Sequence, residues 1–189
     1  MATRKKAASP LLQLKIELAG IKPLIWRRVV VPETITLAKL HQVIQAVMGW
    51  EDYHLHEFEI AGEHYGIPDP DDPFGPPVVS EARAKLGKSL GGMASFRYVY
   101  DFGDDWVHKV KVEKVGAPDT CATPIYLGGA NACPPEDVGG PYGYADFLEA
   151  ISDLVHPEHQ QMRDWVGREF DPKAIDHDMI ELRLRNIKL

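Results

Sequence analysis

The chain has 189 residues, of which 44% are hydrophobic and 26% charged, and its formal net charge is −7 at pH 7. A chain of this length can fold as one domain without a metal ion or disulfide framework. The acidic excess disfavours nucleic acid as a partner, because neutralising phosphates requires clustered Lys and Arg. Two cysteines, Cys121 and Cys133, are too few for a disulfide framework and indicate a reducing, cytoplasmic location. No apolar run approaches the length of a membrane span, so we expect no membrane partner.

The N-terminal residues 1–10, MATRKKAASP, contain basic side chains but no hydrophobic stretch. They are therefore predicted to form a disordered basic tail and not a secretory signal. Contact between the basic residues of this tail and nucleic acid is the alternative. Residues 11–189 are expected to form a single domain.

The first part of the domain is predicted to be a β-hairpin followed by a helix. Apolar and polar residues alternate over 12–18, which is typical of a half-buried strand. The segment 24–32 is apolar on both faces and is predicted to lie inside the sheet. A helix is expected between Thr36, a favourable N-cap, and Gly49, a favourable residue just after a helix end.

A short strand is predicted over HLHEFEI, residues 54–60. Because strand side chains repeat every two residues, His54 and His56 are expected on the same face as Phe58. The acidic, Pro- and Gly-rich segment 61–77 is predicted to be a long loop. A short helix is expected over residues 80–90.

The segment FRYVYDFGDDWVHKVKVE, residues 96–113, predicts a central β-hairpin with its turn at Gly103–Asp104. Strand periodicity gives it a broad aromatic face that includes an Asp and a His. The expected members of this face on the second strand are Asp104, Trp106, His108, Val110 and Val112.

The remaining residues are predicted to form an ordered Gly/Pro-rich loop over 115–143 and a helical part over 144–189. An amphipathic stripe over 147–155 predicts one helix, Pro157 opens a second, and Asp171–Pro172 begins a last one. With a sheet-rich part over 11–114, the fold class is α+β. The expected architecture is a mixed or mainly antiparallel sheet starting with a hairpin and a helix, and a helical C-terminal third.

Several segments together give the chain a family resemblance. In chain order they are IKPLIWRRVVVP, TLAKLHQVIQAVMGW, HLHEFEI, YDFGDDWVH, CPPEDVGGPYGY and WVGREFDP. The chain resembles the plasmid pRiA4b ORF-3-like family, and YDFGDDW followed by CPPEDVGG is the most specific part of the match. The resemblance implies a compact α+β domain of bacteria and archaea, often encoded on plasmids or beside mobile elements. It implies no established activity, and the serines here lie in no Arg-rich cluster of the kind a serine recombinase needs. Members often have Cys where this chain has Val138, so a cysteine metal site is not transferred.

The candidate site is a metal or small-ligand pocket between two strands, lined by His54, His56, Asp104 and His108. Three imidazoles and a carboxylate form a ligand set suited to Zn²⁺ or a similar divalent ion. Glu136 is a weaker candidate, contributed by a loop lying over the hairpin. The competing interpretation is that these histidines are polar members of a half-buried sheet, hydrogen-bonded to carboxylates or backbone.

The leading functional hypothesis is a non-enzymatic or uncharacterised small cytoplasmic binding module of plasmid or mobile-element accessory type. A metal-assisted hydrolase or nuclease is the first alternative, with Asp104 or Glu136 as general base for a bound water. A DNA-associated accessory factor of a transposable element is the second. A protein partner is compatible with all three.

Overall fold

The computed structural model describes residues 8–71, 77–119, 122–167 and 169–189. Residues 1–7 of the expected tail, residues 72–76 and Cys121 therefore lie outside the described residues. The tail prediction is wrong at its end, because Ser9 and Pro10 belong to the first strand.

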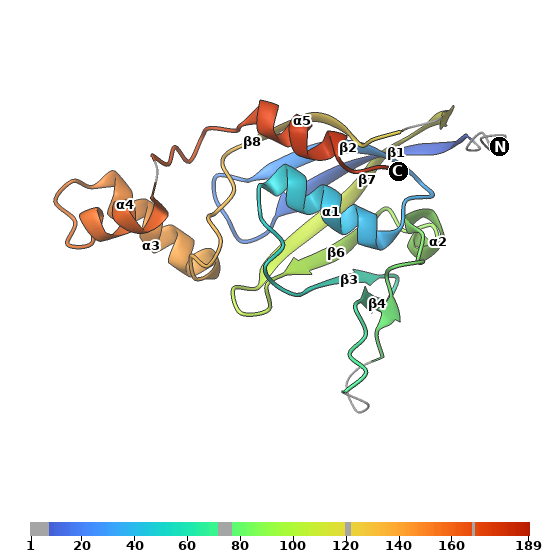
Figure 1. The fold of residues 1–189 in the computed structure, drawn as a ribbon, viewed down its shortest axis with the longest axis horizontal. Helices are drawn as coiled ribbons and strands as arrows, with labels where there is room; N and C mark the ends of the chain where they lie inside the picture. The colour runs from blue at the N-terminus through green and yellow to red at the C-terminus, as the bar shows by residue number, and fades with distance from the viewer. Residues whose placement is uncertain (1–7, 72–76, 120–121, 168) are drawn as a thin grey trace.

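The strands in the described part of the chain form one sheet in the order β5-β4-β3-β6-β7-β1-β2-β8 (Figure 1). All neighbours are antiparallel except β4 and β5, so the α+β class and the mainly antiparallel sheet are confirmed. The strands are β1 Ser9–Leu18, β2 Trp26–Pro32, β3 His56–Ile60, β4 Glu63–Gly66, β5 Val79–Ser80, β6 Ser95–Tyr100, β7 Trp106–Asp119 and β8 Ile125–Ala130.

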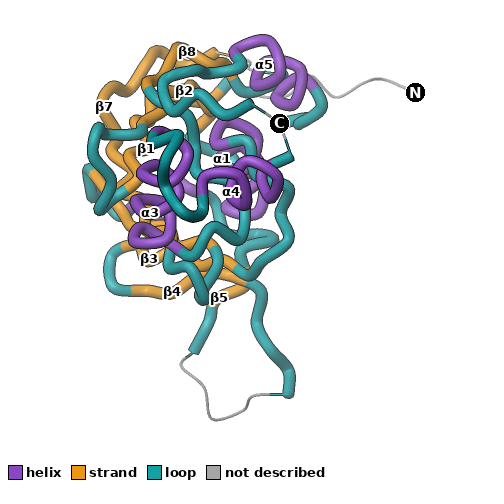
Figure 2. Tube along the Cα trace, turned by 90° about the vertical axis from the view of Figure 1, so that its left-hand side faces the viewer, coloured by secondary structure: helices purple, strands orange, loops and turns teal. Residues whose placement is uncertain are grey.

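The helices lie beside this sheet, with α1 and α5 over the same face (Figures 1 and 2). They are α1 Leu37–Met48, α2 Leu86–Leu90, α3 Gly140–Ser152, α4 His159–Val166 and α5 His177–Arg185. The predicted caps of α1 are confirmed, because the Thr36 hydroxyl accepts from the Lys39 N–H and Gly49 is left-handed at φ 92°. None of the described helices combines the length and the apolar character that crossing a membrane requires.

The core forms between α1 and the central strands. The predicted alternation of β1 is confirmed, because Leu12, Leu14, Ile16 and Leu18 are buried. As predicted, β2 lies inside the sheet, between β1 and β8. Burial of alternate apolar side chains on both strands fixes their register against α1.

The central hairpin differs from the prediction at its turn. Five residues, 101–105, connect β6 to β7, and Asp101 and Asp105 are left-handed at φ 56° and 52°. The Asp101 carboxylate organises the turn by accepting the backbone N–H groups of Gly103 and Asp104. A side-chain-supported turn thus replaces the two-residue turn, and Asp104 leaves the strand alternation.

The prediction of a helical C-terminal third is only partly correct. Its helices are short and separated by loops, and the stripe expected over 147–155 ends with α3 at Ser152. Leu154 and Val155 are exposed, so they do not belong to that stripe. Asp171–Pro172 begins no helix; the last helix starts after Asp176, whose carboxylate accepts from the Met179 N–H.

Two segments expected as loops contain strands. The loop predicted over 115–143 includes the end of β7, which pairs with β1, and β8, which pairs with β2. The segment 61–77 includes β4, which pairs with β3. Backbone hydrogen bonds between strands need no apolar periodicity, so these strands left no pattern in the sequence.

Candidate functional site

The candidate site lies at the end of the sheet where β3 begins and β6 ends. His56 pairs with Tyr100 across these strands, and the Asp101 N–H donates to the Leu55 carbonyl, 2.9 Å away. The chain enters β3 through residues 52–56. Two clusters of polar side chains meet this segment. Asp52 and His56 belong to one, which we call the inner cluster, and His54 belongs to the other, which we call the outer cluster.

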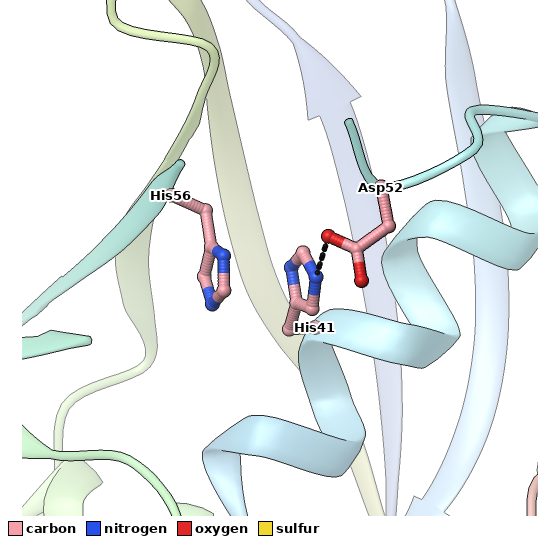
Figure 3. Close-up of side chains that lie close together, drawn as sticks. All are labelled: His41, Asp52 and His56. Atoms are coloured by element: carbon pink, nitrogen blue, oxygen red, sulfur yellow. Dashed lines mark hydrogen bonds and ion pairs between the residues drawn. The ribbon is translucent and has the colours of Figure 1, made fainter. Parts of the chain in front are cut away.

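The inner cluster consists of His41, Asp52, His56 and Glu81, and Figure 3 shows the first three. His41 Nε2 lies 2.8 Å from Asp52 Oδ1, and His56 Nε2 lies 2.8 Å from Glu81 Oε2. The two imidazoles stack with their centroids 3.5 Å apart and an interplanar angle of 8°. Both histidines and Glu81 are buried.

Hydrogen bonds complete the inner cluster. His41 Nδ1 lies 2.8 Å from the Tyr98 hydroxyl oxygen, which also accepts from Gln45 Nε2 at 3.2 Å. Gln45 Oε1 in turn accepts the Asp52 N–H. Both ring nitrogens of His41 are therefore already engaged, which is the arrangement expected of a buried structural network.

The geometry of the inner cluster does not favour a shared metal ion. One potential ligand atom from each of His41, Asp52 and His56 lies within 4.8 Å of the others. However, stacked imidazoles direct their nitrogen lone pairs within parallel planes, whereas metal ligands must converge on one point. Burial lowers the pKa of His41, as does the neighbouring His56, while Asp52 and Glu81 oppose these effects.

The outer cluster consists of His54, Asp101, Glu136 and Asp137. His54 Nε2 lies 2.9 Å from Asp137 Oδ1, 3.6 Å from Asp101 Oδ2 and 4.0 Å from Glu136 Oε2. The orientation toward Asp137 does not meet hydrogen-bond geometry, so this buried nitrogen has no hydrogen-bond partner among the described residues. Three carboxylates therefore surround one imidazole nitrogen.

Asp101 and Glu136 are each fixed by hydrogen bonds to one carboxylate oxygen, and the second oxygen of each faces His54. Asp101 Oδ1 accepts the backbone of the turn, which leaves Oδ2 facing the imidazole. Glu136 Oε1 accepts the Glu51 N–H and the Tyr100 hydroxyl, at 2.8 and 3.1 Å. Glu136 Oε2 is buried and has no hydrogen-bond partner in the described part of the chain. Such outer contacts are the means by which proteins orient metal ligands.

The outer cluster concentrates negative charge. Among the described residues, no Lys or Arg forms an ion pair with Asp101, Glu136 or Asp137. The pKa of Glu136 is raised, mainly by burial and also by Asp137, although its hydrogen bonds and His54 oppose the shift. Asp101 and Asp137 both have positive φ, 56° and 58°, a strained conformation that concentrates at ligand sites.

The loop that carries Glu136 and Asp137 is fixed to the hairpin turn. The Gly139 N–H donates to Asp104 Oδ2 at 3.1 Å. Gly140, at φ 69°, approaches the turn so closely that a Cβ there would lie 2.5 Å from the Asp104 carbonyl oxygen. Only glycine fits at this position, and its close approach brings the two carboxylates to His54.

The residues proposed from the sequence are thus distributed over different places. His54 and Glu136 lie together in the outer cluster, whereas His56 lies in the inner cluster and Asp104 anchors the loop. His108 is fully buried next to Trp50 and Tyr98, with ring centroids 5.3 and 5.2 Å away.

In the described part of the chain, no hydrogen bond, ion pair or ring contact joins His108 to a residue of either cluster. Neither of its ring nitrogens has a hydrogen-bond partner among the described residues, and burial lowers its pKa to about 4. A histidine in this position is a neutral member of the aromatic core. The predicted convergence of three imidazoles therefore does not occur.

Sequence reasoning missed several members of the two clusters. Asp101 lies just before the predicted turn and supports it with one carboxylate oxygen, while the other faces His54. His41 lies within the helix predicted between Thr36 and Gly49 and is buried there, where a polar side chain needs a partner. Asp137 follows Glu136 directly in the CPPEDVGG segment, so the adjacent carboxylates were the available indication.

Comparisons with known proteins define the family to which this chain belongs. The family model described as "Plasmid pRiA4b ORF-3-like protein" matches residues 10–179, and the chain belongs to this family.

Two relatives show how far the similarity extends. An uncharacterised protein of Sinorhizobium fredii, y4hQ, is 40% identical over 171 residues, covering 89% of this chain and 87% of that protein. The crystal structure of MM3350, a protein of unknown function from Methanosarcina mazei, is 41% identical with a TM-score of 0.81. That match covers 90% of this chain and 97% of the other. The similarity establishes the family and the fold, while function must be argued from the site.

Proposed function

We propose that this protein is a binding module for a divalent metal ion, held by His54, Asp101, Glu136 and Asp137. The observation that carries the proposal is that Glu136 Oε2 and His54 Nε2, both buried and 4.0 Å apart, lack a hydrogen-bond partner among the described residues while three carboxylates lie within 4.0 Å of the same nitrogen. A cation between these atoms would satisfy both and would offset the repulsion among the three carboxylates. The proposed site thus differs from the pocket predicted from the sequence, with which it shares only His54 and Glu136.

The ligand chemistry favours a first-row divalent ion. One imidazole nitrogen and three carboxylate oxygens combine a ligand typical of Zn²⁺ with ligands typical of Mn²⁺. Ligand atoms of His54, Asp101 and Asp137 already lie within 4.8 Å of one another, whereas Glu136 does not belong to that group and would have to move closer. Asp137, with 65% of its side chain accessible, is free to adjust to the ion.

Metal-assisted hydrolysis is a second candidate function, because the cluster is not sealed. The His54 side chain is 28% exposed, and Glu136 also lines a neighbouring cavity. In this second candidate, an ion held by His54, Asp101 and Asp137 would carry a water molecule, and Glu136 would accept its proton in place of acting as a ligand. The plasmid or mobile-element accessory role and the cytoplasmic location belong to the proposal on the strength of the family and the few cysteines.

The test is calorimetric titration of the EDTA-treated, tag-free protein with ZnCl₂ and with MnCl₂. We expect one ion per chain. Asp101→Asn should weaken binding by at least about 100-fold, since removing a ligand should cost at least as much as removing an outer contact. Because an Asn oxygen can still accept the turn N–H groups, the hairpin should keep its conformation.

Asp146→Asn, at an exposed position of α3, is the matched control, because it removes the same charge outside the outer cluster. It should leave the affinity unchanged. An equal loss of affinity in both variants, or no binding of either ion by the native chain, would refute the proposal. Hydrolase activity would additionally require turnover that Glu136→Gln abolishes.

A further inference from the structure

A second feature of the molecule is a cavity of about 720 Å³ lined by the end of α1, the segment 132–136, the end of α4 with residues 169–171, and α5. This volume is in the range of small-molecule sites, which are mostly apolar with a few placed polar groups. Its apolar lining includes Trp50, Trp165 and Phe170, and its polar lining includes Arg27.

Arg27 is a cation buried in the wall of this cavity, with only 2% of its surface exposed. Its Nε donates to the Val47 carbonyl at 2.9 Å, and its Nη1 donates to the carbonyls of Trp26 and Ala130. These bonds explain where the guanidinium lies, because Val47 is at the C-terminal end of α1, where positive charge is favoured. They leave Nη2 without a hydrogen bond to the described residues.

No described carboxylate forms an ion pair with Arg27, although buried charges normally require such a partner. Its acidic neighbours are the Cys133 thiol and the Tyr126 hydroxyl. Burial raises the pKa of both groups, so they stay neutral and cannot act as counterions. The Tyr126 hydroxyl itself has no hydrogen-bond partner among the described residues.

The other guanidinium of the cavity provides an internal comparison. Arg183 of α5 donates to the Trp50 carbonyl and forms an ion pair with Glu51. Its charge is therefore neutralised within the protein, whereas the charge of Arg27 is not.

We propose that this cavity binds a small monocarboxylate with an apolar, preferably aromatic, body. The carboxylate would pair with the free side of the Arg27 guanidinium, and the body would pack against Trp50, Trp165 and Phe170. A single negative charge is favoured over a phosphate dianion, because acidic side chains also line the cavity. These are Glu51, Glu136, Glu169, Asp171 and Asp176. The proposal is independent of the metal site, although Glu136 borders both.

The test uses 3-phenylpropionate and its uncharged analogue 3-phenylpropionamide as calorimetric probes, on the full chain treated with EDTA. We expect the carboxylate to bind at least about tenfold more tightly than the amide, because only the carboxylate can pair with a charged donor. Equal affinity for both probes, or no binding of the carboxylate at millimolar concentration, would overturn the proposal. Removing metal ions first means that failure of the metal site does not affect this result.

Two variants locate the probe. Arg27→Gln should abolish the preference for the carboxylate, but it also removes backbone contacts and so could impair folding. Ala174→Trp avoids this difficulty, because Ala174 is an exposed residue at the cavity and a large side chain there should block entry. Ala145→Trp, at an exposed position on α3 that does not line the cavity, is the control and should bind normally. Undiminished binding by a folded Ala174→Trp variant would place the probe elsewhere and reject the inference.

Discussion

The inner and outer clusters contain similar side chains but differ in how these are satisfied. In the inner cluster, stacked histidines have carboxylate partners at 2.8 Å, and Tyr98 and Gln45 complete the network. In the outer cluster, the His54 and Glu136 atoms that face each other have no hydrogen-bond partner among the described residues. A satisfied network stabilises a fold, whereas polar atoms without a protein partner are available to bind a ligand or water. The number of partners therefore distinguishes the clusters better than their residue types do.

The same two segments of the chain carry or contact residues of both clusters. Residues 52–56 contribute Asp52 and His56 to the inner cluster and His54 to the outer one. Two tyrosines of β6 are divided between the clusters in the same way. The Tyr98 hydroxyl contacts His41 of the inner cluster, and the Tyr100 hydroxyl donates to Glu136 of the outer cluster. The clusters thus share strand segments but no side chain, so their contributions to stability and to binding can be tested separately.

His56→Ala is expected to give the largest change in stability among the variants that test this comparison. It leaves the Glu81 carboxylate buried without its imidazole, which should lower the free energy of unfolding by about 2 kcal/mol. Affinity for the metal ion should stay within about threefold of native, because His56 contributes no atom to the outer cluster. Urea unfolding and calorimetry measure the two quantities.

His54→Ala is the reciprocal variant. Because His54 is partly exposed and has no hydrogen-bond partner, its loss should change the free energy of unfolding by less than about 0.5 kcal/mol. It should nevertheless remove metal binding. If the His56 and His54 variants lost stability and affinity to the same extent, the division into two clusters would be wrong.

A smaller effect is expected from Tyr100→Phe, which tests the support of Glu136. The variant removes the hydroxyl that donates to Glu136 Oε1 but keeps the aromatic ring that packs on Trp50. Loss of such an outer contact should weaken metal binding by about tenfold. Tyr53→Phe is a matched control, because Tyr53 is exposed. An unchanged affinity in Tyr100→Phe would show that the Tyr100 hydroxyl does not orient a ligand, since the Glu51 N–H alone would then hold Glu136.

How much of this could be predicted from the sequence depends on how local the cause is. The alternation of β1 and the caps of α1 are decided by neighbouring residues, and both were predicted correctly. The turn after β6 was not, because the left-handed Asp101 is supported by its own side chain and breaks the two-residue alternation. Carrying that alternation through the turn placed Asp104 on the wrong face.

The candidate site depended on contacts between distant parts of the chain. Strand parity placed His54 and His56 in one pocket, but β3 begins at His56 and only that histidine follows the strand. His41 comes from α1, and Asp137 comes from a loop more than 80 positions beyond His54. That loop reaches the site because Gly140 packs on the hairpin turn, which no periodicity indicates.

The smallest expected effect is a difference in pH dependence between the clusters. The pKa of His41 is lowered from its usual 6.5, so below about pH 6.5 the unfolded chain binds a proton before the folded one. The metal-free protein therefore loses stability in this pH range as the pH falls.

Glu136 has the opposite effect. Its pKa is raised from the usual 4.5, so the folded chain takes up this proton first and gains stability as the pH falls through that raised value. His41→Gln should consequently flatten the acid-side decline in melting temperature relative to native, whereas Glu136→Gln should steepen it. Saturating Zn²⁺ should steepen the decline of the native chain too, because a bound cation keeps Glu136 ionised. Melting curves between about pH 4.5 and 7 would measure these differences, and shifts of the same sign in both variants would contradict the assignment of opposite environments.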